Sequence, residues 1–420
     1  MHLKTIIAAF ALALTTIGAT RVQAQDPGPR LPATAIDASG AEVLLNLEDY
    51  RNIIGYRVYG KAELTDPEWT LLTDTHLTSP MLRDEPGASV HDFTALPTAS
   101  VLKVTGFKFF KIHGVRKEVT FDKVVQTIRI NLNDFSVTKL PGDFEVSSDP
   151  LAKTEHLYLR YIKPDGDTFT MGSPEEEYGR SADRETQTVV TLTQGFYLGV
   201  YAVTEAQYDR IMGVPTPSDS AKPKTPISWN SIRGGSGASP LTAPTLGSPL
   251  GTLSNKVSTA SGGSIALTFD LPTEAQWEYA CRAGTTGTLY DGNDIITTEE
   301  DNIARVEPLA WVISNSGGVF HDAGLKRANP AGLYDLFGNA WEWCRDANGS
   351  ASAGDNLDLP GGSEVDYFKT DGTTRVLRGG SIFATWCRTA RRISYGGGAS
   401  NPDDINPLGF RLGAFGDMVP

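Results

Sequence analysis

Two acidic side chains in one glycine-containing stretch are the residues of this sequence best suited to chemistry. Asp335 and Glu342 stand in the stretch 332–343, which reads Gly-Leu-Tyr-Asp-Leu-Phe-Gly-Asn-Ala-Trp-Glu-Trp. Its apolar positions recur neither at every second residue, as in a strand, nor at the 3.6-residue period of an amphipathic helix. The pattern therefore predicts a compact loop, which we call the central loop.

The central loop is predicted to fold back at Gly338-Asn339, because both residue types tolerate positive φ angles. The aromatic residues on either side would anchor its ends in a core. This curl would bring the carboxylates of Asp335 and Glu342 together with backbone carbonyls, and such a set of oxygens suits a calcium ion. A simpler interpretation stays open, in which both carboxylates only accept backbone hydrogen bonds.

Charge and histidine content argue against other kinds of site. The formal net charge is −13, whereas a protein that binds nucleic acid needs a basic surface to displace counterions, so we expect no nucleic-acid partner. The six histidines are scattered without the spacing of metal ligands, which argues against a zinc or iron site built on histidine. The sequence contains no P-loop, nucleophile elbow or zincin motif.

Residues 1–24 have the pattern of a secretory signal peptide. Lys4 supplies the charged start, Ile6 to Leu14 the apolar middle, and Val22-Gln23-Ala24 a cleavage site with small residues before Gln25. The apolar middle is too short to cross a membrane, and no other stretch reaches about 18 uninterrupted apolar residues. We therefore expect an exported protein, secreted or periplasmic, with no membrane span.

The chain is long enough for more than one domain. Its 420 residues suggest two or three domains at about 100–200 residues each. Residues 26–118 contain short strand-like runs separated by turns, which predicts a small all-β, sandwich-like module. Residues 119–150 are expected to supply one strand and a connector, and residues 151–420 a second domain.

Two capping boxes predict helices within the second domain. Thr204 and Gln207 flank the start of a helix over 205–212, and Thr273 and Gln276 flank the start of one over 274–283. In each box the threonine and the glutamine side chains bind each other's backbone N–H groups. The second domain should therefore mix helices with strands.

Seven motifs in order show that about residues 155–415 resemble a known family, the formylglycine-generating enzyme or sulfatase-modifying factor family. The resemblance implies one α+β domain with a C-type-lectin-like fold and little regular secondary structure. The motifs are Phe-Thr-Met-Gly-Ser at 169–173, Tyr-Ala-Val-Thr at 201–204, Pro-Ile-Ser-Trp at 226–229, Leu-Pro-Thr-Glu-Ala-Gln-Trp-Glu-Tyr-Ala at 271–280, the central loop, Arg-Gly-Gly-Ser at 378–381 and Gly-Phe-Arg at 409–411.

The resemblance also implies calcium at the central loop. A second family calcium site would begin at Asn302-Ile303, although the residues that should complete it, within 315–321, do not match clearly. The ligands implied at the first site are the side chains of Asp335 and Glu342 and the backbone oxygens of Gly338 and Ala340.

The oxidases of this family hold copper between two cysteines, three and eight residues after the serine of Arg-Gly-Gly-Ser, and use oxygen to convert a substrate cysteine to formylglycine. Counted from Ser381, these positions are Ala384 and Thr389 in this chain, and Cys387 is the one thiol nearby. A single thiolate cannot supply the pair that favours copper(I). Copper is therefore not expected, and iron held by clustered histidines, as in some relatives, is not expected either.

The three cysteines permit one disulfide in an oxidising compartment. The resemblance implies a bridge between Cys281 and Cys387, because the helix cysteine that follows Trp-Glu-Tyr is bridged in the oxidases. A Cys344–Cys387 bridge is the competing possibility.

Ligand-binding residues of the lectin-like members lie in segments that correspond to 382–386 and 393–406. An exposed face there would bind a protein or a small ligand, because aromatic residues and arginine dominate interface energetics. The alternative is that the rings are core residues and the arginines are ion-paired. The candidate residues are Phe383, Trp386, Arg388, Arg391 and Tyr395.

Two functions stay open. The first is an exported binding or accessory module without oxidase activity. The second is a formylglycine-generating oxidase, or another activity that modifies proteins, in which Ser381 and Cys387 would be the catalytic candidates.

Overall fold

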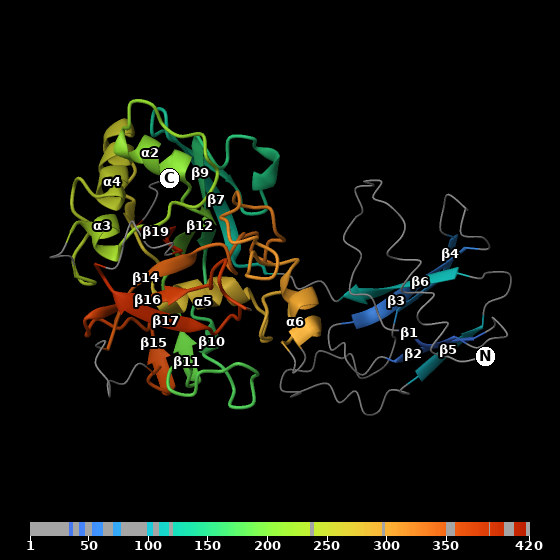
Figure 1. Ribbon diagram of the computed structural model, residues 1–420. Coiled ribbons are helices and arrows are strands. Elements are labelled where there is room, and N and C mark those ends of the chain that lie inside the picture. Colours follow the sequence, from blue (N-terminus) through green and yellow to red (C-terminus); the bar gives the residue numbers. More distant parts are fainter. Residues whose placement is uncertain are drawn as a thin grey trace. The chain divides into compact units, whose positions relative to one another are not determined.

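The computed structural model describes residues 121–416, except 236–238, 296–298, 350–357, 386 and 399–406, together with six strands between residues 33 and 116. The signal peptide predicted at 1–24 lies outside the described residues. The chain divides into two compact units, Met1–Glu118 and Val119–Pro420 (Figure 1).

The first unit contains two three-stranded antiparallel sheets, ordered β1-β2-β5 and β4-β3-β6. No helix is present among its described residues. The strands are β1 (Ala33–Ile36), β2 (Glu42–Asn46), β3 (Ile53–Lys61), β4 (Thr70–His76), β5 (Ala99–Lys103) and β6 (Phe109–Arg116).

The second unit is built on a six-stranded antiparallel sheet with the order β13-β19-β12-β9-β7-β8. Residues 119–150, for which one strand and a connector are predicted, supply two strands of this sheet, β7 and β8. β7 pairs along its length with β8 on one side and with β9 on the other. The strands are β7 (Val124–Asn131), β8 (Val137–Pro141), β9 (His156–Ile162), β12 (Phe196–Ala202), β13 (Thr268–Asp270) and β19 (Arg411–Phe415).

Two smaller sheets complete the second unit, ordered β17-β16-β14-β18 and β10-β11-β15. The central loop runs directly into β14, so the first of these sheets carries Glu342. Their strands are β10 (Thr168–Met171), β11 (Thr188–Thr191), β14 (Trp341–Asn348), β15 (Gly362–Val365), β16 (Thr374–Arg378), β17 (Arg392–Gly396) and β18 (Leu408–Gly409).

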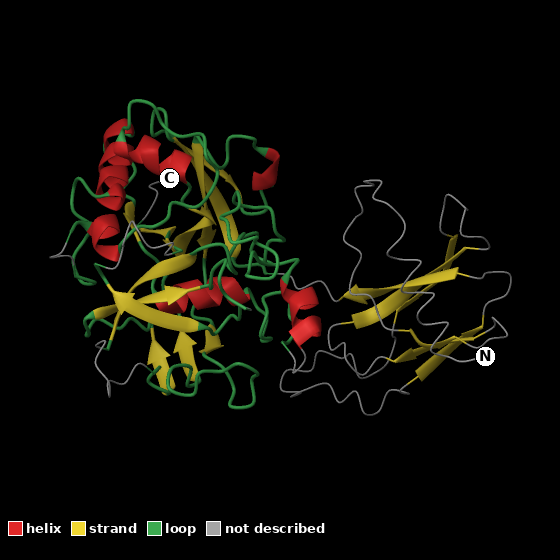
Figure 2. Cartoon of the chain, viewed as in Figure 1, coloured by secondary structure: helices red, strands yellow, loops and turns green. Residues whose placement is uncertain are grey.

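The α-helices of the second unit are short, and Figure 2 shows how much of this unit is loop. Both predicted capping boxes are present, with Thr204 and Gln207 at the start of α2 and Thr273 and Gln276 at the start of α5. The α-helices are α2 (Glu205–Met212), α3 (Trp229–Arg233), α4 (Pro249–Ala260), α5 (Glu274–Arg282) and α6 (Glu299–Val306), and a 3₁₀ turn η3 covers Val146–Ser148.

The core of the second unit consists of two clusters of buried side chains. The larger one contains Trp277 and Cys281 of α5 together with Phe337 of the central loop, and the other contains Trp229 and Trp343. The predicted α+β fold with few helices is confirmed. No helix in the described part of the chain is long and apolar enough to cross a membrane.

Candidate functional site

The central loop folds back as predicted. Asp335, Gly338 and Asn339 have φ angles of 54°, 72° and 58°, in the left-handed region. A Cβ atom on Gly338 would lie 2.2 Å from the carbonyl oxygen of Trp311, so only glycine fits there. Asn339 accepts the backbone N–H of His321 at 3.1 Å and donates to its carbonyl at 2.9 Å, which fixes the turn.

The two carboxylates of the central loop have different partners. Glu342 is 1% exposed; Arg411 donates to both of its oxygens, at 2.8 and 3.0 Å, and Trp277 Nε1 donates at 2.7 Å. One oxygen of Asp335 accepts the Gly324 N–H at 2.6 Å, whereas the other is buried with no hydrogen-bond partner among the described residues. Burial raises the pKa of Asp335 to about 6. Of the two carboxylates, Asp335 is therefore the one whose negative charge is less well compensated by its neighbours.

The residues expected at a second calcium site take part in local structure. Asn302 is buried in α6, and the carbonyl oxygen of Ile303 accepts the Glu307 N–H at 2.9 Å. His321 stacks on Trp311 with 3.7 Å between ring centroids. Within the described ranges, no three Asp, Glu, His or Cys side chains are grouped so that they could hold a metal ion.

The positions of the copper cysteines are filled by side chains without thiols. Ala384 is 7% exposed and Thr389 is fully buried. The Thr389 hydroxyl donates to the carbonyl of Gly287 at 3.3 Å, and its backbone N–H donates to Thr288 at 2.8 Å. The hydroxyl of Ser381 accepts the Phe383 N–H at 3.3 Å. These groups serve the packing of the segment 381–389.

All three cysteines lie in the described part of the chain and are buried free thiols, so neither the predicted Cys281–Cys387 disulfide nor a Cys344–Cys387 bridge is present. The sulfur of Cys387 instead fills space beside Gly380, where a Cβ atom would lie 2.6 Å from that sulfur and 3.6 Å from the Ala384 Cβ. Burial raises the pKa of this thiol to about 12. Cys387 is therefore a packing group beside Gly380.

The expected ligand-binding face is only partly exposed. Phe383 and Tyr395 are 43% and 47% exposed, and Arg391 lies over the ring of Trp341 at 5.7 Å from its centroid. Arg388, by contrast, is only 1% exposed. Trp386 lies outside the described residues.

Arg388 is buried because two glutamates surround it. Its guanidinium donates to Glu185 twice, at 2.8 Å each, and to Glu177 at 2.6 Å. It also donates to the carbonyl of Gly179 at 2.6 Å. The alternative interpretation, an ion-paired arginine, therefore holds at this position.

A buried charge network, which the sequence did not lead us to expect, fastens the C-terminal segment to α5. Arg392 donates to both oxygens of Glu274, at 2.6 and 2.7 Å, and Arg378 lies 3.2 Å from Glu274 and pairs with Glu278. The acids on the first two turns of α5 and the arginines in 378–392 were visible in the sequence. Their pairing was not.

Asp346 of β14 lies beside this network. Its two oxygens accept the backbone N–H groups of Glu274 at 2.7 Å and Lys369 at 3.2 Å. Burial, and then the charge of Glu274, raise its pKa to about 7. Asp346 is therefore a buried acid that ionises at a higher pH than an ordinary aspartate.

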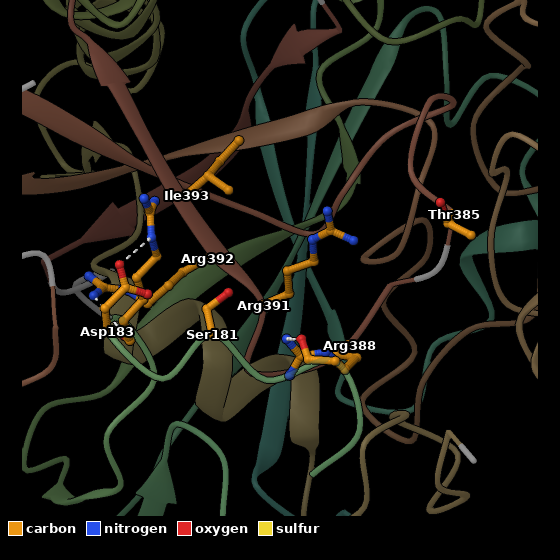
Figure 3. Close-up of a pocket in the computed structure, with 9 residues that line it drawn as sticks. Ser181, Asp183, Thr385, Arg388, Arg391, Arg392 and Ile393 are labelled. Atoms are coloured by element: carbon orange, nitrogen blue, oxygen red, sulfur yellow. Dashed lines mark hydrogen bonds and ion pairs between the residues drawn. The ribbon is translucent and has the colours of Figure 1, made fainter. Parts of the chain in front are cut away.

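A cavity of 640 Å³ opens between the segment 179–184 and the residues from Thr385 to Ile393. Its wall contains four arginines and one acid, Asp183, and Figure 3 shows Asp183 beside Arg392 with Thr385 at the opposite end of the view. The four arginines are Arg184, Arg388, Arg391 and Arg392.

The family model described as "Sulfatase-modifying factor enzyme 1-like domain" matches residues 159–413. Since this match covers more than half of the chain, the protein belongs to the sulfatase-modifying factor family. The family that the seven motifs predict is thereby confirmed.

Curated relatives match a shorter part of the chain. The formylglycine-generating enzyme of Streptomyces coelicolor is 33% identical over 164 residues, which cover 36% of this chain and 48% of that protein. The mouse enzyme is 29% identical over 159 residues, 36% of this chain and 40% of that protein. "Inactive C-alpha-formylglycine-generating enzyme 2" of Bos taurus is 30% identical over 161 residues, 36% of this chain and 45% of that protein. The chain thus spans less than half of the length of these relatives.

Among solved structures, Treponema denticola variable protein 1 matches 61% of this chain and 95% of its own, with 23% identity and a TM-score of 0.43. PvdO from Pseudomonas aeruginosa matches 61% of this chain and 94% of its own, with 19% identity and a TM-score of 0.41.

Proposed function

We propose that this protein is an exported binding module of the sulfatase-modifying factor family that does not oxidise cysteine. One observation carries the proposal: Thr389, where the second copper cysteine of the oxidases would stand, is fully buried, and its hydroxyl donates to Gly287. A hydroxyl is a poor ligand for copper(I), which prefers soft thiolates. A relative named as inactive supports a member without oxidase activity.

The ligand would bind near the exposed Phe383 and Tyr395. Thr385 and Arg391, which stand between these two residues in the sequence, line the cavity. The cavity provides a concave surface. Its volume is within the usual range of about 300–1,000 Å³ for ligand pockets.

Copper binding tests this proposal directly. The purified protein should take up no stoichiometric copper(I) in competition with a chromogenic copper(I) chelator, because one buried thiol with a raised pKa cannot replace a pair of thiolates. A Cys387→Ser variant should give the same titration. One copper per chain, lost in Cys387→Ser, would contradict the proposal.

We also propose that calcium binds the central loop. Asp335 fits a cation, because one of its oxygens is buried without a hydrogen-bond donor among the described residues. The carbonyls of Gly338 and Ala340 on the same turn would complete the site with Glu342, which would share its charge with Arg411. The ion would neutralise a buried carboxylate that burial otherwise penalises.

Calcium should therefore raise the unfolding temperature. A ligand that binds only the folded state stabilises it by about 2.7 kcal/mol at a hundredfold excess over Kd. Thermal melts with calcium and with a chelator should differ for the wild type and coincide for Asp335→Ala. Identical wild-type melts in the two buffers would remove the calcium site.

A further inference from the structure

A lysine and a buried asparagine meet at the end of β14. Nζ of Lys369 lies 3.5 Å from the side-chain oxygen Oδ1 of Asn348, the last residue of that strand. Asn348 is 3% exposed, and Lys369 is half-buried. Because N–H···O hydrogen bonds usually span about 2.7–3.2 Å, the hydrogen bond between this amine and this amide is a weak one.

The backbone is fixed on both sides of this contact. The N–H of Lys369 donates to the carboxylate of Asp346 at 3.2 Å, and its carbonyl accepts the Ala347 N–H at 2.9 Å. Asn348 pairs with Thr374 of β16, whose hydroxyl donates to the Asn348 carbonyl at 3.2 Å. The folded chain therefore presents the amine and the amide to each other.

We propose that Lys369 and Asn348 join in an intramolecular isopeptide bond, which makes this pair a site of self-modification. Nζ of Lys369 attacks Cγ of Asn348, a new Nζ–Cγ amide bond forms, and the Cγ–Nδ2 bond breaks. Nδ2 leaves as ammonium with the two protons that the lysine ammonium loses, so atoms and charge balance without an oxidant or a reductant. The product is a neutral amide that ties β14 to the segment 366–372.

Fixed geometry is the main argument for this reaction. An amine and an amide react very slowly in water, but reactants held with their reacting atoms about 3–3.5 Å apart reach effective molarities of about 10⁵–10⁸ M. Cγ of Asn348 is bonded directly to Oδ1, so the amine of Lys369 lies close to this range. Amide formation also removes a positive charge from a half-buried place, where a charged group costs solvation energy.

Asp346 is a positioning residue for this reaction, since its carboxylate holds the backbone of Lys369. Asp346 is fully buried. Burial, and then the charge of Glu274, raise its pKa to about 7, and Arg392 opposes this shift. A carboxyl group with such a pKa can accept and release a proton near neutral pH, and the lysine ammonium must lose a proton before it attacks.

Mass spectrometry of the purified full chain tests the proposal. The intact mass should fall short of the sequence mass by one ammonia molecule, and trypsin should not cleave after Lys369, because its side chain is then an amide. The digest should contain a branched peptide in which Lys369 is joined to Asn348. A full sequence mass together with cleavage after Lys369 would overturn the proposal.

Variants separate the isopeptide bond from other losses of ammonia. Lys369→Arg keeps the positive charge but replaces the amine, so the mass deficit should disappear. Lys163→Arg is the matched control: its side chain is 52% exposed and lies 3.2 Å from Asp165, and the deficit should stay. A deficit that persists in Lys369→Arg would overturn the proposal, because Asn348, which precedes Gly349, can also lose ammonia by closing on its own backbone.

Asp346→Asn tests the positioning role. Asparagine keeps one acceptor oxygen but cannot exchange a proton near neutral pH, so linkage after cell-free synthesis should slow by at least about tenfold. The change of rate around pH 7 that Asp346 gives the wild type should also be absent, while circular dichroism should be unchanged. A rate and a pH profile equal to those of the wild type would overturn the role of Asp346.

Discussion

Replacing Arg388 by leucine is expected to lower the free energy of unfolding of the second unit by about 3–5 kcal/mol. Breaking a buried ion pair by removing one partner leaves an uncompensated charge in the interior. Here the remaining charges would be those of Glu185 and Glu177, whose side chains are 0% and 8% exposed. Chemical denaturation followed by tryptophan fluorescence measures the loss.

Arg391→Leu is the matched control for this experiment. It removes an arginine three positions away that is only half-buried, and it should cost no more than about 1 kcal/mol, as is usual for partly exposed charges. The double variant Arg388→Leu/Glu185→Gln should recover part of the loss, because it removes one of the stranded carboxylates. Equal losses for Arg388→Leu and Arg391→Leu would contradict the buried role of Arg388.

Replacing Asp346 by asparagine should change how stability depends on pH. An aspartate titrates at 3.8 in the unfolded chain and at about 7 in the folded protein. Between these values the folded protein holds a proton that the unfolded chain releases, so this group's contribution to stability falls as pH rises from 3.8 to about 7 and is constant above that. The wild type should lose up to about 4 kcal/mol relative to the variant over this interval, at 1.36 kcal/mol per pKa unit.

The test for Asp346 is how the difference in unfolding free energy between variant and wild type changes with pH, and not the size of that difference at one pH. Asparagine keeps one acceptor oxygen and loses the other, so one of the hydrogen bonds from Glu274 and Lys369 is lost at every pH. Denaturation at pH 4, 6 and 8 should show that the free energy of unfolding of the variant increases relative to that of the wild type as pH rises. A difference that stays constant with pH would mean that Asp346 ionises normally in the folded protein.

Features governed by neighbouring residues could be predicted from the sequence. Both capping boxes depend on two side chains three positions apart, and both are present. The turn at Gly338-Asn339 depends on the φ preferences of these two residues, and both have the positive φ angles that the sequence predicts.

Features governed by distant residues could not be predicted in this way. Arg388 finds Glu185 at a separation of 203 positions, so the sequence supplies the charges without showing which of them meet. The same limit applies to Cys387, whose sulfur fits beside Gly380 rather than joining Cys281. It applies as well to β7, whose alternating residues predict a strand but not its place in the main sheet.

Oxidation of a peptide is the most direct test of the central claim, that this member of the family does not make formylglycine. The purified protein would be incubated with copper(I), oxygen and a cysteine-containing sulfatase peptide, with the Streptomyces coelicolor relative as the positive control. Because Ala384 and Thr389 stand where the oxidases have cysteines, the peptide mass should stay unchanged while the control peptide loses its thiol and gains an aldehyde. Turnover together with one bound copper per chain would contradict the account.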